Sequence, residues 1–473
     1  MAVSKDKTFS VLVLTGNFMN DFMSIIVFAI LDLIDFLLCY AYRVVDFTFE
    51  AGWKPCYCSS AGEASSKIVL ERGETKTNVC LSSSKFQLEG MSDTLYTRSS
   101  LISEVSKLTN VSGLKTETNS VIQRIDKFIK GRLRSPSFNI IEMLQGKIGD
   151  QQSHHAPRWS DCDCQTCNAW SFSTGDTLFL KAEGTLGNAE ENVIFIHGFI
   201  SSSAFWTETL FPNFSKSVKS RYRLFAFDLL GFGKSPKPND SFYTIREHLE
   251  MIERSVLEHN KVKSFHIVAH SLGCILALAL AVKYPGSVKS LTLIAPPYFQ
   301  APKGEKATQY VMRRLAPRRV WPMIAFGASV ACWYEHIGRT ICLVLCKNHR
   351  VWEFLIKLLT RNRMRTYLIE GFCCHTHNAA WHTLHNIICG SAGKMEAYLD
   401  VLEKNMTCNV NIFHGRDDEL IPLECSYNVQ SRVPRSRVEI IENKDHLTIV
   451  VGRQKAFARE LEEIWNSSSN LSS

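Results

Sequence analysis

Beyond about residue 172, short apolar runs alternate with segments whose apolar positions have helical spacing. Continuous apolar runs are typical of strands buried on both faces of a parallel sheet, and the segments between them supply helical crossovers. In one such segment, Thr244 and Glu247 have the spacing of a capping box. We therefore expect an α/β fold with a mostly parallel sheet, whose strands are predicted at residues 193–196, 224–227, 265–268, 291–294, 410–413 and 438–441.

The third apolar run leads directly into Ala269-His270-Ser271-Leu272-Gly273 and then into an almost wholly apolar helical segment. A strand, a tight turn and a buried helix with one serine at the apex resemble the nucleophile elbow of the α/β-hydrolases. That pattern is Gly-x-Ser-x-Gly, and here Ala269 takes the first glycine position. Alanine is small enough to keep helix and strand close, so Ser271 is the predicted nucleophile.

Polar motifs also follow the first two runs. His197-Gly198-Phe199 follows residues 193–196, and Asp228 with a glycine-rich sequel follows residues 224–227. This order resembles the α/β-hydrolases, and the resemblance implies an oxyanion hole formed by the backbone N–H groups of Phe199 and Leu272, with His197 and Gly198 in the active-site loop. Asp228 is a conceivable catalytic acid, but its glycine-rich sequel favours a role in organising the loop.

The acid and the base of a catalytic triad are predicted after the last two runs. Hydrolase-fold proteins carry Gly-x-x-Asp with a proline four residues on, which selects Asp418 rather than Asp417. The family places its histidine after the last strand, where His446 lies. The chain order Ser271, Asp418, His446 is that of the hydrolase fold, with His446 as general base and Asp418 as the residue that orients it.

Residues 297–402 separate the fourth and fifth predicted strands and are too many for a simple crossover, so we expect a helical cap over the active site. The cap is rich in Trp, Phe and Leu, which suits an apolar acyl chain. Its arginines fit either lipid phosphates or solvated helix faces. Four histidines lie between His375 and His385; a metal site there would need convergent geometry that spacing cannot show, and no metal or other cofactor is predicted.

The first 50 residues hold two apolar runs, at 9–14 and 22–42, and the second is long enough to span a bilayer. Asp32 and Asp35 interrupt it at a spacing that places both on one helix face. The segment is predicted to be a membrane anchor, a tilted interfacial helix or an export signal. The alternative is a buried helix pair of a soluble protein.

Residues 51–170 are predicted to be a linker that ends in a cysteine cluster, and residues 467–473 a disordered tail; residues 171–296 and 403–466 form the predicted core. Cys162, Cys164 and Cys167 could hold zinc with a fourth ligand such as His154 or His155. A second cysteine pair at metal-finger spacing is absent from the sequence, which favours disulfides or a structural role.

The length, net charge and cysteine content of the chain narrow its function only slightly. The 473 residues carry a net charge of +8, without a long basic block or a nucleic-acid motif, so no nucleic-acid partner is expected. The 16 cysteines permit an oxidising compartment.

Several stretches together resemble a narrower family, the plant BODYGUARD proteins. These stretches are residues 32–38, 159–162, 268–274, 375–385 and 414–422. The resemblance implies a lysophospholipase or lipid esterase of cuticle and cutin formation, acting at the membrane or cell wall outside the plasma membrane of epidermal cells.

We therefore expect a serine hydrolase of lipid esters that forms an acyl-serine intermediate and is exported to the cell surface, either anchored or secreted. An acyltransferase or polyester synthase would use the same triad, and a binding protein could retain the fold without activity. An epoxide hydrolase is disfavoured, because that chemistry places a carboxylate where Ser271 stands.

Overall fold

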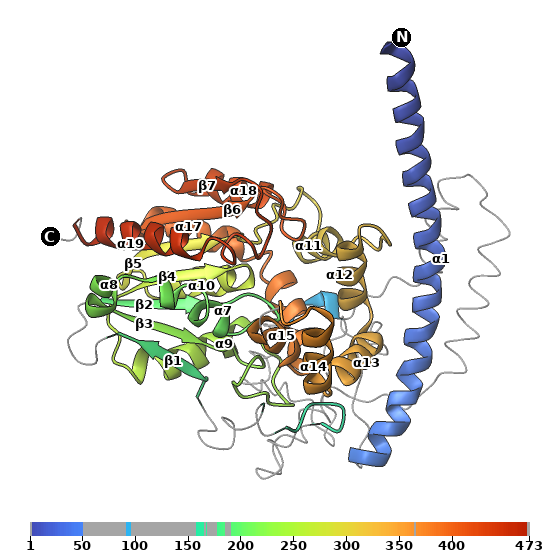
Figure 1. The fold of residues 1–473 in the computed structure, drawn as a ribbon, viewed down its shortest axis with the longest axis horizontal. Coiled ribbons are helices and arrows are strands. Elements are labelled where there is room, and N and C mark those ends of the chain that lie inside the picture. The colour runs from blue at the N-terminus through green and yellow to red at the C-terminus, as the bar shows by residue number, and fades with distance from the viewer. Residues whose placement is uncertain are drawn as a thin grey trace, which may run out of the picture.

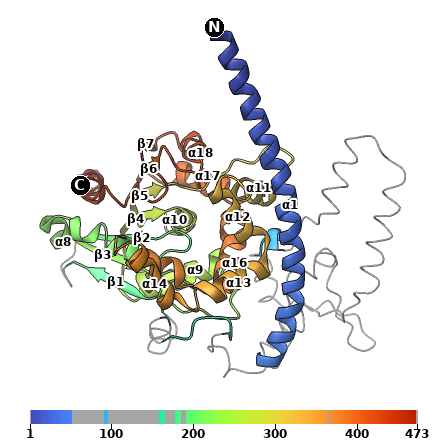
Figure 2. The same ribbon diagram turned by 45° about the vertical axis from the view of Figure 1, so that its right-hand side comes forward.

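The computed structural model describes residues 2–50, 91–95, 158–164, 167, 177–184, 191–363 and 366–470 of the chain. A central sheet is covered by helices on both faces, and a group of cap helices lies at one end (Figure 1). The long helix α1 (Ala2–Glu50) lies beside the cap in both views (Figures 1 and 2). Most of the predicted linker, including His154 and His155, lies outside the described residues.

The sheet has seven strands in the order β1-β3-β2-β4-β5-β6-β7. Six of them coincide with the predicted apolar runs and pair in parallel, so the expected α/β class is confirmed: β2 (Glu191–Ile196), β3 (Tyr222–Phe227), β4 (Phe265–His270), β5 (Val288–Ile294), β6 (Asn409–Gly415) and β7 (Arg437–Ile441). The sequence did not predict β1 (Leu180–Glu183), an antiparallel edge strand on β3. Its residues are only partly buried, so it lacks the apolar run that marks the others.

Alternate residues of the central strands enter two separate cores, which explains their continuous apolar runs. Ile194 and Ile196 pack into the core on one face, and Val193 and Phe195 into the core on the other. The first face is covered by α9 (Ile245–Ile252), η3 (Glu253–Glu258), α10 (Leu272–Lys283), α17 (Met395–Asn405) and α18 (Glu424–Arg432). The second is covered by α7 (Ala204–Thr207), η2 (Phe211–Asn213), α8 (Lys216–Arg221) and α19 (Gln454–Asn470).

Local helix signals are confirmed at α9, where Thr244 and Glu247 form the predicted capping box. At α19 the prediction of a disordered tail from residue 467 is corrected, because the helix continues to Asn470. Phe457, Leu461 and Trp465 anchor its inner face in the core, and extending an existing helix by a few residues costs little.

The cap consists of seven helical segments between β5 and α17: α11 (Ala307–Leu315), α12 (Met323–Trp333), α13 (Glu335–Leu345), α14 (His349–Leu359), α15 (Thr366–Cys373), α16 (His377–Thr383) and η4 (Leu384–Cys389). The predicted cap, residues 297–402, included most of α17, on which Met395, Tyr398 and Leu402 form an apolar stripe. Instead Met395, Leu399 and Leu402 pack in the same core cluster as α10, so α17 belongs to the layer that covers the sheet.

Helix α1 is one continuous helix rather than a pair, and its acidic residues face the cap. The Asp32 carboxylate accepts hydrogen bonds from the Arg318 guanidinium at 3.0 and 3.1 Å. Asp35, 1% exposed, accepts the backbone N–H groups of His336 and Ile337 at 2.9 and 3.0 Å. Both aspartates that interrupt the apolar segment therefore have hydrogen-bond partners in the cap.

The other side of α1 is an apolar stripe exposed to solvent. By length and composition, the part Met19–Glu50 could cross a membrane. The exposed apolar side chains include Phe22, Ile26, Ile30, Leu33, Phe36, Leu37, Val44 and Phe49. Helix α1 is thus amphipathic. One side contacts the cap through its aspartates, and the other presents apolar side chains of the kind that pack against lipid.

Candidate active site

Ser271 lies at the tip of the turn between β4 and α10. Its backbone has φ 53° and ψ −122°, a conformation that non-glycine residues rarely adopt and that tight nucleophile turns impose. A Cβ on Gly273 would lie 2.6 Å from the Ile196 carbonyl oxygen, so a side chain there would clash with the backbone of β2. Ala269, paired with Ile196 in the sheet, is fully buried, which shows that this position accommodates a methyl group.

The loop after β2 runs directly beside this turn. A Cβ on Gly198 would lie 3.2 Å from the Ser271 Cβ and 3.0 Å from the His270 ring nitrogen Nδ1. Phe199, the next residue, packs against both the core and the apolar cluster of the cap. The Leu272 N–H belongs to the first turn of α10, where helical N–H groups lack intrahelical acceptors. Both residues predicted for the oxyanion hole thus adjoin the serine turn.

Asp418 and His446 lie on the loops that follow β6 and β7. The His446 Nδ1 donates a hydrogen bond to the Asp418 Oδ2 at 2.6 Å. The other carboxylate oxygen accepts the backbone N–H groups of Leu420 and Ile421, each at 2.9 Å. With Nδ1 protonated and bound, the Nε2 of His446 is the nitrogen left to accept a proton.

Burial by itself raises the pKa of the Asp418 carboxyl, but the hydrogen bond and positive charge of His446 and the Ile421 N–H outweigh burial, so this pKa lies below its ordinary value. Asp418 is therefore ionised at neutral pH. The neighbouring Asp417 is exposed, and its backbone N–H bonds to the Lys444 carbonyl. The geometry thus agrees with the choice of Asp418 over Asp417.

The Ser271 hydroxyl makes no hydrogen bond to His446 within the described part of the chain. Such bonds are often long in enzymes without substrate. The two residues are nevertheless connected through His270, whose ring centroid lies 4.6 Å from that of His446.

His270 is a positioning residue that the sequence did not identify. Its Nε2 donates a hydrogen bond to the His446 carbonyl oxygen at 2.9 Å, and its ring stacks on Phe205. Burial, together with the neighbouring His446, lowers the pKa of His270 to about 3, so the ring is a neutral donor at physiological pH. The residue before Ser271 therefore holds the loop that carries His446.

Replacing His270 by alanine is expected to lower kcat about two- to tenfold, because a neutral hydrogen bond contributes about 0.5–1.5 kcal/mol. KM should change little, and His270→Gln, whose amide can donate to the same carbonyl, should recover part of kcat. Steady-state kinetics across pH measure both constants. A loss equal in both variants, with an unchanged pH profile, would assign His270 a packing role only.

His414 supports the carboxylate from the buried side, another contact missed in the sequence. Its Nε2 donates to the Ile421 carbonyl at 2.9 Å and lies 3.5 Å from the Asp418 Oδ2. The Ser426 Oγ lies 2.6 Å from its Nδ1, and burial lowers the pKa of the His414 imidazole. The support that His414 and Ser426 give could have been found only from three-dimensional contacts, since the motif at residues 414–422 assigns His414 no role and Ser426 lies outside it.

His197 and Asp228 organise loops rather than face a substrate. The His197 Nδ1 donates to the Gly198 carbonyl at 2.8 Å, and its Nε2 accepts the Leu229 N–H at 2.9 Å. Both ring nitrogens are therefore used by the backbone. Asp228 accepts the backbone N–H groups of Ser203 and Lys234 at 2.6 and 2.7 Å, in agreement with a loop-organising role.

Comparisons with known proteins agree with this architecture. The model of the alpha/beta hydrolase fold family matches residues 191–321. Three proteins of Arabidopsis thaliana align over nearly the whole chain. "Probable lysophospholipase BODYGUARD 1" is 58% identical over 463 residues, covering 95% of this chain and 97% of the relative. "Probable lysophospholipase BODYGUARD 3" is 55% identical, covering 99% and 100%. "Probable lysophospholipase BODYGUARD 4" is 39% identical, covering 96% and 98%.

These alignments cover 95–99% of the chain and so extend well beyond the matched hydrolase segment. The resemblance predicted from the sequence motifs is therefore confirmed. The protein has the α/β-hydrolase fold, and the chain belongs to the BODYGUARD family.

Proposed function

We propose that the protein is a serine hydrolase of lipid carboxylic esters, with lysophospholipids as its substrate class. The observation that carries this proposal is the 2.6 Å hydrogen bond from His446 to Asp418, beside the strained turn that presents Ser271. An orienting acid, an oriented base and a serine in this turn are the components of acyl transfer through an acyl-enzyme.

In the proposed reaction, the Ser271 Oγ attacks the ester carbonyl carbon while its proton passes to the His446 Nε2. The N–H groups of Phe199 and Leu272 stabilise the negative charge that develops on the carbonyl oxygen. The bond from the carbonyl carbon to the alcohol oxygen then breaks, and His446 returns the proton to the departing alcohol. Water, activated by His446, releases the fatty acid and restores Ser271.

The lipid nature of the substrate is supported by the relatives and by the apolar surface. The three relatives are described as probable lysophospholipases. The cap adds exposed apolar side chains to the stripe of α1, namely Trp321, Met323, Ile324, Ile341, Val344, Val351, Phe354, Leu358 and Leu359. Exposed apolar area on this scale suits attachment to a lipid surface.

We further propose that α1 is retained in the mature protein and holds the cap against one leaflet of a membrane. The α1 residue Asp46 forms a buried bidentate pair with the cap residue Arg339, both hydrogen bonds being 2.7 Å. Removal of α1 as a cleaved signal would remove this pair and expose the cap surface that α1 covers. The family resemblance supports a finer proposal, that the lipids serve cuticle formation outside the plasma membrane.

The test uses full-length protein in detergent, offered lysophosphatidylcholine, a monoacylglycerol and a cutin-type ester. Release of fatty acid and glycerophosphocholine is expected, and Ser271→Ala is the control. Hydrolysis of the other esters but not of lysophosphatidylcholine would reject the substrate class. Transfer of the acyl group to an added long-chain alcohol in preference to water would indicate an acyltransferase.

A further inference from the structure

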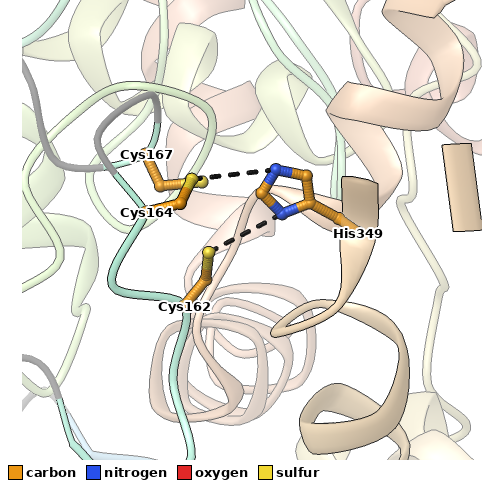
Figure 3. A group of neighbouring side chains, drawn as sticks. All are labelled: Cys162, Cys164, Cys167 and His349. Atoms are coloured by element: carbon orange, nitrogen blue, oxygen red, sulfur yellow. Dashed lines mark hydrogen bonds between the residues drawn. The ribbon is translucent and has the colours of Figure 1, made fainter. Parts of the chain in front are cut away.

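Cys162, Cys164 and Cys167 converge on His349, a residue that lies 187 positions after Cys162 at the start of α14. The four potential ligand atoms lie within 4.8 Å of one another (Figure 3). Figure 3 shows the cysteine side chains gathered around the imidazole ring of His349. These residues lie outside the catalytic loops.

The spacing of these atoms fits a tetrahedral metal. The Cys164 Sγ lies 3.8 Å from the His349 Nε2, whereas the Cys162 Sγ lies 3.7 Å from the Nδ1, so a metal bound to Nε2 requires a small shift of Cys162. Ligands at the usual zinc distances lie about 3.6–3.8 Å from one another around a tetrahedral ion. The His349 Nδ1 also lies 3.1 Å from the Cys346 carbonyl oxygen, to which it can donate, and this leaves Nε2 for the metal. Such a backbone partner is common for zinc-bound histidine.

We propose that Cys162, Cys164, Cys167 and His349 form a closed, structural zinc site. Three thiolates and one imidazole suit Zn²⁺, and a full set of four protein ligands leaves no position for substrate. The sequence favoured disulfides or a structural role because a second cysteine pair at metal-finger spacing is absent; the fold supplies a fourth ligand, His349, from the cap.

The zinc would join three parts of the molecule. Arg158 and Trp159, just before the cysteines, donate hydrogen bonds to Asp46 of α1 at 2.8 and 2.6 Å. His349 belongs to the cap, and Lys237 of the core donates to the Cys167 carbonyl. The site thus holds the segment that connects α1, the cap and the core.

A second group of ligands carries an independent inference. Cys342 lies in the last turn of α13 and Cys346 is the C-cap residue of that helix; their Sγ atoms lie 3.6 and 3.7 Å from the His375 Nε2. We infer a second zinc site held by Cys342, Cys346 and His375, whose potential ligand atoms all lie within 4.8 Å of one another.

The competing chemistry is disulfide formation. The Cys167 Sγ lies 3.9 Å from the Cys374 Sγ, close enough for a bond after a small movement. A disulfide there would remove one thiolate from the first site. The oxidation state of the thiols therefore distinguishes the two possibilities.

The test is metal analysis of the full-length protein, purified in detergent without chelators. Two zinc ions per chain are expected. Cys164→Ser should lose one and Cys342→Ser the other, whereas Cys408→Ser, a buried cysteine outside both groups, should retain two. A strong chelator should lower the melting temperature of the wild type.

Cobalt substitution keeps the proposal testable if a variant fails to fold. Wild-type protein loaded with Co²⁺ should show thiolate-to-metal charge-transfer absorption, and Ser271→Ala should show the same spectrum, because neither site depends on activity. Wild type without zinc, whose cysteines resist alkylation until a reductant is added, would overturn both sites in favour of disulfides. A single zinc that only Cys164→Ser removes would support the first site and reject the second.

Discussion

Ser271→Ala is expected to abolish both ester hydrolysis and covalent labelling by a fluorophosphonate probe. Loss of the nucleophile of a serine triad lowers kcat by about 10⁴-fold or more, and only slow catalysis by the remaining groups persists. The substitution removes one oxygen from an already small side chain, so the fold should be unaffected. Probe labelling followed by mass spectrometry, with circular dichroism as the folding control, measures both points.

Adjacent aspartates provide a matched control for the rest of the triad. Asp418→Asn should lower kcat by several orders of magnitude, because the amide can no longer hold His446 in the required tautomer. Asp417→Asn changes an exposed neighbour and should leave kcat nearly unchanged. Equal effects of the two variants would contradict the assignment of the acid, and undiminished labelling of Ser271→Ala would place the nucleophile elsewhere.

The second large effect is a loss of stability, which we expect when the buried ion pair between α1 and the cap is broken. Asp46→Ala should lower the free energy of unfolding by about 3–5 kcal/mol, because it leaves Arg339 buried without its carboxylate. The side chains of Asp46 and Arg339 are each 7% exposed, so solvent cannot replace the lost partner. Thermal or chemical unfolding in detergent micelles provides the measurement.

Asp21→Ala is the matched control on the same helix. Its ion pair with Arg319 is 3.9 Å long, and both side chains are more than half exposed. Such pairs contribute about 0–1 kcal/mol, so little change is expected. The double variant Asp46→Ala with Arg339→Met should be more stable than Asp46→Ala alone, since it removes the unpaired charge. Equal stability of Asp46→Ala and wild type would show that α1 does not dock on the cap as described.

The sheet could be predicted, and candidate catalytic residues could be proposed in chain order, because both depend on local signals. A strand buried on both faces requires a continuous apolar run, and six of the seven strands had one. The weak edge strand β1 lacked this signal. Helix α17 was assigned to the cap because its apolar stripe does not reveal which surface it covers.

The contacts that support the candidate triad were harder to predict from the sequence. His270 could be seen beside Ser271 in the chain, but its hydrogen bond to the His446 carbonyl depends on a loop 176 residues away. His414 likewise acts on Asp418 only because β6 and the following loop fold back.

By itself, the sequence determined the α/β class, the serine turn, the oxyanion-hole, acid and base candidates in hydrolase order, and an apolar N-terminal helix, because each depends on neighbouring residues. Tertiary structure decided which distant groups meet. It provided Asp32, Asp35 and Asp46 with partners in the cap, and it brought His349 to three cysteines of another segment. The physical reason is that charges and metal ligands act over a few ångströms in space, whatever their separation along the chain.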